Sequence, residues 1–270
     1  MKSWTASIAA LTVVLYVSAI VLGLRVKSLS TFSAHAATHR ILPWQPPARA
    51  TLPLGPLGDS IRRGAQIFNN TRLYAAAYTA SRVSCTNCHS DGGIQPYASP
   101  VVDSPGRYPV YSPRAGRVIS LQDRIEECFV RSENGQPLPY DSAEMRALVD
   151  YIAWLSQPQP DRVAFEGIGF IRLPQLKPDP SRGARVYAGQ CAGCHGEHGE
   201  GAPPLFPPLW GPDSFNDGAG MGDIAKLAPF VQHNMPQNRM GNLSPQEAFD
   251  VAAFIHAQPR PAFQAAYKMY

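Results

Sequence analysis

The sequence predicts an all-α protein built from two related helical domains in tandem, and three observations support this prediction. The stretch "DSIRRGAQIF" opens a helix in the first half, and "DPSRGARVYAGQ" opens a similar one in the second, so that Gly64 and Phe68 match Gly183 and Tyr187. The stretches "SAEMRALVDYIAWLS" and "SPQEAFDVAAFIHAQ" then close the two units with a matching pair of helices. No alternating strand pattern of any length occurs in the chain.

The repeat divides the chain of 270 residues into six segments. The order is a signal peptide or N-terminal membrane anchor (1–37), a Pro-rich linker (38–58), the first domain (59–157), a second linker (158–180), the second domain (181–262) and a tail (263–270). We expect Asp59 or Ser60 to cap the opening helix. The closing helix of the first domain carries apolar residues at helical spacing, namely Met145, Leu148, Ile152 and Leu155.

The N-terminus has the pattern of an export signal, with Lys2, an apolar run over 8–24, then Arg25 and Lys27. This run is long for a cleaved signal and short for a membrane span, so both fates stay open. In either case we expect the bulk of the chain in a bacterial periplasm, anchored to the inner membrane if the leader is retained. The net charge of +4 suits small anions or an acidic partner and excludes a nucleic-acid-binding role.

Two C-x-x-C-H motifs occur, one in each domain, and this is the attachment signature of c-type haem. Two cysteines at this spacing reach one porphyrin edge, and the histidine that follows is aimed at the iron. A redox C-x-x-C, a zinc site or a disulfide is the alternative, but two copies between matching helices favour haem. The sequence therefore predicts two cytochrome c folds with two covalently bound haems and their iron, attached at Cys85, Cys88, Cys191 and Cys194, with His89 and His195 as proximal ligands.

The second domain offers several candidates for the sixth iron ligand. Met235 precedes Pro236 on a loop before the last helix, which is the usual position of a methionine ligand, so we favour it. A methionine elsewhere is more often core filler. The other candidates are Met221, Met240, His198, His233 and His256, of which Met240 is the runner-up.

The first domain has no such methionine, because Met145 lies inside the closing helix and no histidine follows His89. The residue in the corresponding place is Cys128, the fifth cysteine of the chain. An inert buried cysteine is the alternative, but neighbouring arginines and a ferric iron would both favour a thiolate here. We therefore predict that Cys128 is an iron ligand and the reactive centre.

A thiolate ligand should lower the potential of the first haem, and a methionine ligand should raise that of the second, so electrons would run from the first domain to the second. Arginine binds oxyanions with a fork of donors. If the substrate is a sulfur oxyanion, Cys128 could bond to its outer sulfur while arginines offset the repulsion between two anions. Arg114 and Arg124 are the strongest candidates in a basic set that also contains Arg107, Arg117 and Arg131.

Four segments resemble the dihaem thiosulfate dehydrogenases, also called tetrathionate synthases: "SCTNCHSDGG", "YSPRAGRVISLQDRIEECFVRSENGQPLP", "CAGCHGEHGEG" and "NMP". The resemblance implies periplasmic oxidation of two thiosulfates to tetrathionate, with the preferred direction open. It implies His89 and Cys128 on the first iron, His195 and Met235 on the second, and a substrate site made of Arg114, Arg124 and Ser132. Some members place a lysine before the methionine, where this chain has Asn234, so a lysine ligand switch is not expected.

Two alternatives to this enzyme remain from the sequence: a non-catalytic dihaem electron carrier, and a haem subunit of a sulfur-oxidising complex. A dihaem peroxidase has less support, because it does not account for the cluster of arginines and cysteine. The expected partners of the enzyme are thiosulfate or tetrathionate and a soluble or membrane cytochrome that accepts electrons.

Overall fold

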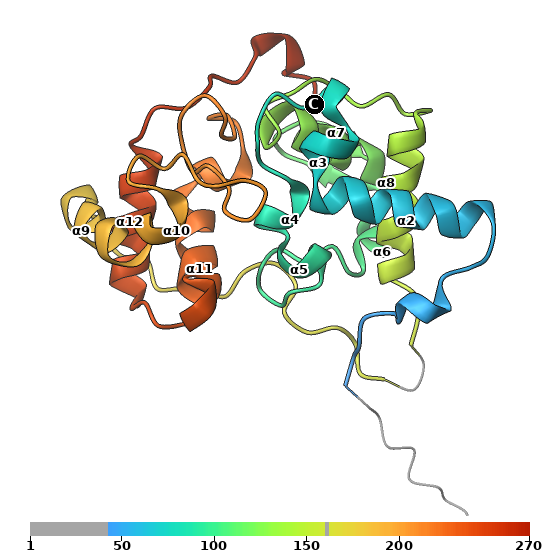
Figure 1. Ribbon diagram of the computed structural model, residues 1–270, viewed down its shortest axis with the longest axis horizontal. Helices are drawn as coiled ribbons and strands as arrows, with labels where there is room; N and C mark the ends of the chain where they lie inside the picture. Colours follow the sequence, from blue (N-terminus) through green and yellow to red (C-terminus); the bar gives the residue numbers. More distant parts are fainter. Residues whose placement is uncertain (1–42, 160–161) are drawn as a thin grey trace, which may run out of the picture. The chain divides into compact units, whose positions relative to one another are not determined.

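The computed structural model describes residues 43–159 and 162–270. The leader expected over residues 1–37 lies outside this part of the chain. Among the described residues, none of the helices has the length and apolar character needed to cross a membrane. Residues 44–158 and 164–270 form one compact unit that contains both predicted domains. Figure 1 shows this unit as a set of helices joined by long irregular segments.

The first half of the chain contains two longer helices that pack on each other, α2 (Pro56–Asn69) and α8 (Ala143–Leu155). Between them come α3 (Thr71–Tyr74), α4 (Cys85–Cys88), α5 (Ser90–Gly93), α6 (Ser104–Arg107), β1 (Val110–Ser112), β2 (Arg117–Ile119) and α7 (Leu121–Arg131). The 3₁₀ turns of this half are η2 (Arg49–Thr51) and η3 (Ala76–Tyr78).

The second half repeats this plan with α9 (Pro180–Gln190) packed on α12 (Pro245–His256). Between them lie α10 (Ala192–His195), η4 (Gly220–Gly222), α11 (Ile224–Asn234) and η5 (Gln237–Arg239), and η6 (Ala265–Tyr267) follows them. The fold is therefore all-α in its architecture, as predicted, with two helix pairs of the same kind. The domain boundaries themselves remain a prediction.

A glycine lets the helices of each pair approach closely. A Cβ on Gly64 would lie 2.0 Å from the carbonyl oxygen of Ala147 and 2.7 Å from Cβ of Tyr151, so only hydrogen fits there. In the second pair, a Cβ on Gly183 would lie 2.0 Å from the carbonyl oxygen of Asp250. The predicted match between these two glycines is thus a match in their packing role.

The core of the first half lies between α2 and α8. All four apolar residues predicted for the closing helix are buried, with exposed fractions of 1–4% at Met145, Leu148, Ile152 and Leu155. The second core uses Tyr187 on α9 together with Phe249 and Ile255 on α12. Each core also contacts the first cysteine of its C-x-x-C-H motif, so the packing that stabilises the helices also positions the haem attachment points.

The predicted cap of the opening helix is wrong, because α2 begins three residues before Asp59, with Gly55 at the N-cap and Pro56 in the first position. Proline is favoured there, since its fixed φ suits a helix and its missing N–H would be unpaired anyway. Asp59 lies in the first turn instead. The closing helices begin at the serines of their quoted stretches, and Ser142 and Ser244 accept backbone N–H bonds as N-caps.

One short hairpin lies within the otherwise helical fold. Strands β1 and β2 pair antiparallel with Val110 opposite Ile119, and Gly116 in the turn has a φ of 66°. Strands of three residues are too short to give a detectable alternation, which explains why the sequence did not predict them. The hairpin leads directly into α7.

Replacement of Gly183 by alanine should lower the free energy of unfolding by about 1–3 kcal/mol, because the new methyl group must push α9 and α12 apart. Gly189 is the matched control, since it lies on the same helix and a Cβ there meets nothing within 4 Å. Gly189→Ala should be neutral or stabilise by up to about 1 kcal/mol. Urea unfolding followed by circular dichroism measures both, and equal effects of the two substitutions would contradict the packing argument.

Candidate active site

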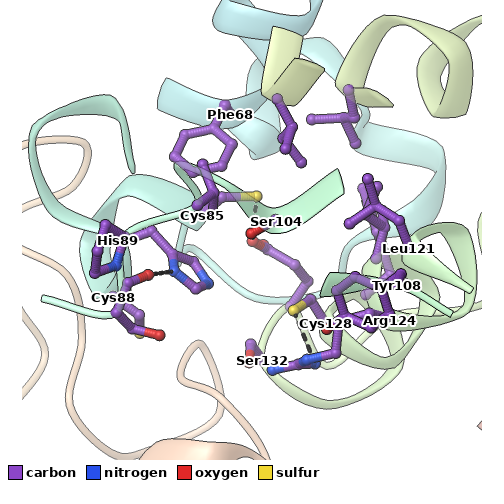
Figure 2. Close-up of a pocket in the computed structure, with 18 of the residues that line it drawn as sticks. Phe68, Cys85, Cys88, His89, Ser104, Tyr108, Leu121, Arg124, Cys128 and Ser132 are labelled. Carbon is purple, nitrogen blue, oxygen red and sulfur yellow. Dashed lines mark hydrogen bonds between the residues drawn. The ribbon is translucent and has the colours of Figure 1, made fainter. Parts of the chain in front are cut away.

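A cavity of about 350 Å³ lies in the first half of the molecule, between the C-x-x-C-H motif and α7. Figure 2 shows His89 and the two cysteines of the motif on one side and Cys128 with Arg124 on the other. Most of the remaining wall is apolar and comes from α2, α7, α8, the segment before α4 and the loop after α5, through Phe68, Val83, Val101, Leu121, Ile125, Phe129, Leu148 and Ile152.

The motif is held in place by local backbone contacts. Ser84 caps α4 in a capping box with Asn87, which fixes the turn that carries Cys85 and Cys88. Nδ1 of His89 faces the carbonyl oxygen of Ser99 at hydrogen-bond distance. Burial lowers the pKa of His89 to about 4, so the imidazole is neutral near pH 7. With Nδ1–H donated to a carbonyl, Nε2 keeps its lone pair for a metal.

Cys128 lies on α7, and the capping box of Ser120 and Asp123 fixes where this helix begins. One turn before the cysteine, Nη1 of Arg124 lies 3.3 Å from Sγ of Cys128 and 3.3 Å from Oε2 of Glu127. The electrostatic influence of the nearby Cys128 is the largest cause that raises the pKa of the Arg124 guanidinium. The arginine is therefore a fixed positive charge beside this sulfur.

The residues around this cavity fit a c-type haem. Two sulfurs line one edge, a neutral imidazole with an oriented Nδ1 lies on one face, and a single sulfur lies on the other. The apolar wall suits the porphyrin ring, whereas a polar wall would not. His89 and Cys128 are thus placed where both could hold the iron, and Cys85 and Cys88 where both could hold the ring.

A second cavity of about 380 Å³ adjoins the first one. It brings together the four residues predicted for the catalytic site, Arg114, Arg124, Cys128 and Ser132. Since Cys128, Arg124 and Ser132 line both cavities, the sulfur lies where the two spaces meet. A group bound in the second cavity would therefore have direct access to Sγ.

Two arginines of the predicted basic set have other partners. Arg131 is buried, and its Nη2 donates to the carbonyl oxygen of Tyr270 at 2.6 Å while its guanidinium lies 4.0 Å from the ring centroid of Phe263. Arg117 pairs with Asp123 at 3.0 Å. Neither arginine lines either cavity, so their role is to hold α7 and its neighbours rather than an anion.

The remaining arginine of the set, Arg107, lines the first cavity, and its Nη2 donates to Oγ of Ser104 at 2.8 Å. It does not line the second cavity, where Arg114 and Arg124 lie. We therefore separate it from the candidate anion site.

Sequence reasoning missed two glutamates beside Cys128. Glu127 is 4% exposed, and its Oε1 has no hydrogen-bond partner among the described residues. Its spacing of three from Arg124 was a signal that could have found this pair. Glu133 is 1% exposed, and its Oε2 accepts from Oγ1 of Thr79 at 3.2 Å. Burial, as the largest cause, raises the pKa of Glu133 to about 8; nothing in the sequence signalled this burial.

The histidine of the second motif is oriented in the same way as that of the first. Nδ1 of His195 lies 3.0 Å from the carbonyl oxygen of Pro207, and burial lowers the pKa of this histidine. Met235 directly follows α11 and packs against the apolar cluster that also contacts Cys191 and Met221. Met240, by contrast, is 53% exposed.

The histidines considered as sixth ligands of the second iron lie in other surroundings. His198 and His256 are exposed. The ring of His233 contacts that of Tyr97 edge-on at a centroid distance of 5.1 Å. Met235 and Met221 therefore remain the candidates in contact with the apolar cluster, and we keep Met235 because of its position directly before Pro236.

Comparison with known proteins places the chain in a family. A family model described as the cytochrome c domain of SoxA/TsdA matches residues 69–160, and a cytochrome c model matches residues 180–259. A thiosulfate dehydrogenase of Allochromatium vinosum is 41% identical over 241 residues, which cover 86% of this chain and 89% of that protein. The chain belongs to the thiosulfate dehydrogenase family.

Other members of the thiosulfate dehydrogenase family agree. The thiosulfate dehydrogenase of Psychrobacter arcticus is 40% identical over 80% of this chain and 68% of its own length. A solved thiosulfate dehydrogenase (TsdBA) from Marichromatium purpuratum is 39% identical with a TM-score of 0.76, covering 81% of this chain. This chain covers 50% of that structure's chain. Family membership and two cytochrome c domains confirm the predicted fold and two covalently bound c-type haems with iron.

Replacement of Met235 by alanine should remove the weak red absorption band of a methionine-ligated ferric haem, because the thioether would be lost. Met240→Ala is the matched control, since Met240 is exposed and should leave the band unchanged. Both variants should keep two attached haems. Loss of the band in Met240→Ala, with the band retained in Met235→Ala, would contradict our assignment.

Proposed function

We propose that the protein couples two thiosulfate anions into tetrathionate at Cys128, and that the same site supports the reverse reduction. The observation that carries this proposal is the position of Cys128, whose sulfur lies where the haem-sized cavity and the arginine-lined cavity meet. A pure electron carrier would not need an oxyanion cavity at an iron ligand. The overall reaction releases two electrons, which matches a protein with two one-electron haems.

The reaction divides into two balanced steps at the sulfur of Cys128. In the first, the thiolate bonds to the outer sulfur of one thiosulfate, which gives a cysteine S-thiosulfonate and releases two electrons. In the second, the outer sulfur of another thiosulfate attacks the bridging sulfur, so that tetrathionate leaves and the thiolate returns. Arg124 lies 3.3 Å from Sγ of Cys128, so it can hold the sulfonate of the first anion while the sulfurs join.

Electrostatic repulsion is the main obstacle to this coupling. A thiosulfate dianion about 4 Å from the single negative charge of the thiosulfonate is repelled by about 2 kcal/mol even in water, and by more in a drier cavity. Arg114 and Arg124 line the same cavity and would offset this repulsion, since guanidinium groups bind oxyanions through paired N–H donors. Ser132 follows the last turn of α7 and offers a hydroxyl to the same anion.

We propose that His89 and Cys128 hold the first iron and that His195 and Met235 hold the second. When bound, the two haems would accept the electrons and pass them from the Cys-ligated centre to the Met-ligated centre, because thiolate lowers and methionine raises the potential. The protein's own part is to keep both imidazoles neutral and oriented through the carbonyl oxygens of Ser99 and Pro207.

We further propose a periplasmic enzyme whose electrons pass to another cytochrome. The leader pattern at residues 1–37 supports export, and covalent haem attachment suits a compartment outside the cytoplasm. The proposed division is a first domain at 59–157, which carries the reaction, and a second at 181–262, which carries electrons onward. Whether the leader is retained as a membrane anchor is a separate question, which N-terminal sequencing of the mature protein answers.

Cys128→Gly should abolish thiosulfate-dependent reduction of ferricyanide, because the sulfur that accepts thiosulfate is gone. Cys128→Met is the matched control for iron binding, since it keeps a sulfur ligand but has no thiolate, and it should be inactive as well. Both variants should retain two covalently attached haems by pyridine haemochrome analysis. Full activity in either variant would refute the role proposed for Cys128.

Arg124→Gln should raise the KM for thiosulfate at least about tenfold, because a charge-assisted hydrogen bond contributes about 1.5–3 kcal/mol. Arg131→Gln should leave KM within about twofold but lower the free energy of unfolding by about 1–3 kcal/mol, since it removes a buried contact to the C-terminal segment. Steady-state kinetics and urea unfolding separate the two effects. A large KM change in Arg131→Gln would contradict its exclusion from the anion site.

A further inference from the structure

The cavity beside Cys128 is lined by residues from both halves of the chain. Its lining includes Arg124 and Cys128 from α7 and Ser132, which follows the end of that helix. Its lining also includes Phe170, Gly220, Met221 and Lys226, all of which come after the first domain. Residues from the second half therefore surround part of the space that the substrate would occupy.

We propose that Lys226, together with Arg114, forms an outer anion subsite that binds the thiosulfate that attacks second. This inference rests on the proposed function and adds a residue from the second domain to the site. The same subsite would hold the distal sulfonate of tetrathionate in the reverse direction. Lys226 is then a determinant of substrate affinity rather than a group that takes part in bond making.

The charges around the cavity explain why a second cation is needed. Arg124 is shared between Sγ of Cys128 and the buried carboxylate of Glu127, so its charge is already partly compensated. Once a first thiosulfate is bound to Cys128 and Arg124, a second dianion would meet a negative sulfonate. Arg114 and Lys226 are the remaining positively charged side chains in the lining of this cavity, and Arg114 is exposed enough to meet an arriving anion.

The position of Lys226 is set by its own helix. It lies in the first turn of α11, and its Nζ is 3.0 Å from Oδ2 of Asp223, which also caps the helix. An exposed pair of this kind contributes little to stability, so stability alone gives no reason for its placement. Asp223 does not line the cavity. The carboxylate therefore restrains the ammonium group from outside, while Lys226 itself borders the space next to Cys128.

The test compares Lys226→Gln with Lys226→Arg and Lys177→Gln in the complete dihaem protein at fixed ionic strength. Lys177 is an exposed lysine that lines neither cavity. Lys177→Gln therefore makes the same change in net charge as Lys226→Gln without changing the cavity. We expect Lys226→Gln to raise the KM for thiosulfate about tenfold with kcat within about twofold of wild type. Lys226→Arg should restore KM to within about threefold, and Lys177→Gln should match wild type.

An equilibrium measurement separates this inference from the proposed function. The Cys128 thiolate can exchange with tetrathionate without any electrons, so calorimetry is carried out on oxidised protein in the Cys128→Gly background, where it measures tetrathionate binding without reaction. We expect Lys226→Gln to weaken this binding about tenfold relative to Lys177→Gln. If wild type does not oxidise thiosulfate, the proposed function fails, and the calorimetric difference still decides the role of Lys226. Equal KM and equal tetrathionate affinity in the two glutamine variants would overturn the subsite.

Discussion

The contact between Arg124 and Cys128 is the constraint on which the rest of the site depends. The two residues lie one turn apart on α7, so the helix itself sets the 3.3 Å distance between guanidinium and sulfur. This arrangement keeps a positive charge beside a sulfur that must also face the haem cavity. On a loop, the side chains of Arg124 and Cys128 would each need their own restraint to keep these orientations. The position of α7 therefore decides what Cys128 can reach.

Contacts at both ends fix α7. At its start, Asp123 completes the capping box with Ser120 and pairs with Arg117. Burial alone would raise the pKa of Asp123, but these hydrogen bonds lower it strongly, so the carboxylate stays charged. At its end, Nδ2 of Asn216 donates to the carbonyl oxygen of Val130 at 2.8 Å, and Arg131 bonds to the backbone of Gly218 and Tyr270. The second half of the chain thus stabilises the helix that carries Cys128.

The sequence was sufficient for features that depend on local pattern. The spacing of Met145, Leu148, Ile152 and Leu155 predicted a helix with an apolar face, and the structure buries that face. The match of Gly64 with Gly183 predicted two related units, and both glycines lie where two helices approach closely. The sequence was insufficient where the surroundings of a residue depend on which distant segment packs over it. Arg124 and Arg131 are two turns apart on one helix, so pattern alone could not tell that one meets a cavity and the other the C-terminal segment. The burial of Glu127 and Glu133 is likewise a tertiary result.

The two haem sites are alike on one side and different on the other. His89 and His195 each direct Nδ1 to a backbone carbonyl, and burial lowers the pKa of both, so the proximal sides give no reason for different chemistry. The two halves differ in their candidate second ligands, since the first has Cys128 beside a guanidinium and the second has Met235 in contact with an apolar cluster. The sulfur of Cys128 borders a cavity that arginines also line, whereas the thioether of Met235 packs against apolar side chains. The two halves therefore share a fold and the surroundings of the histidine, and they differ in the other side chains near each motif.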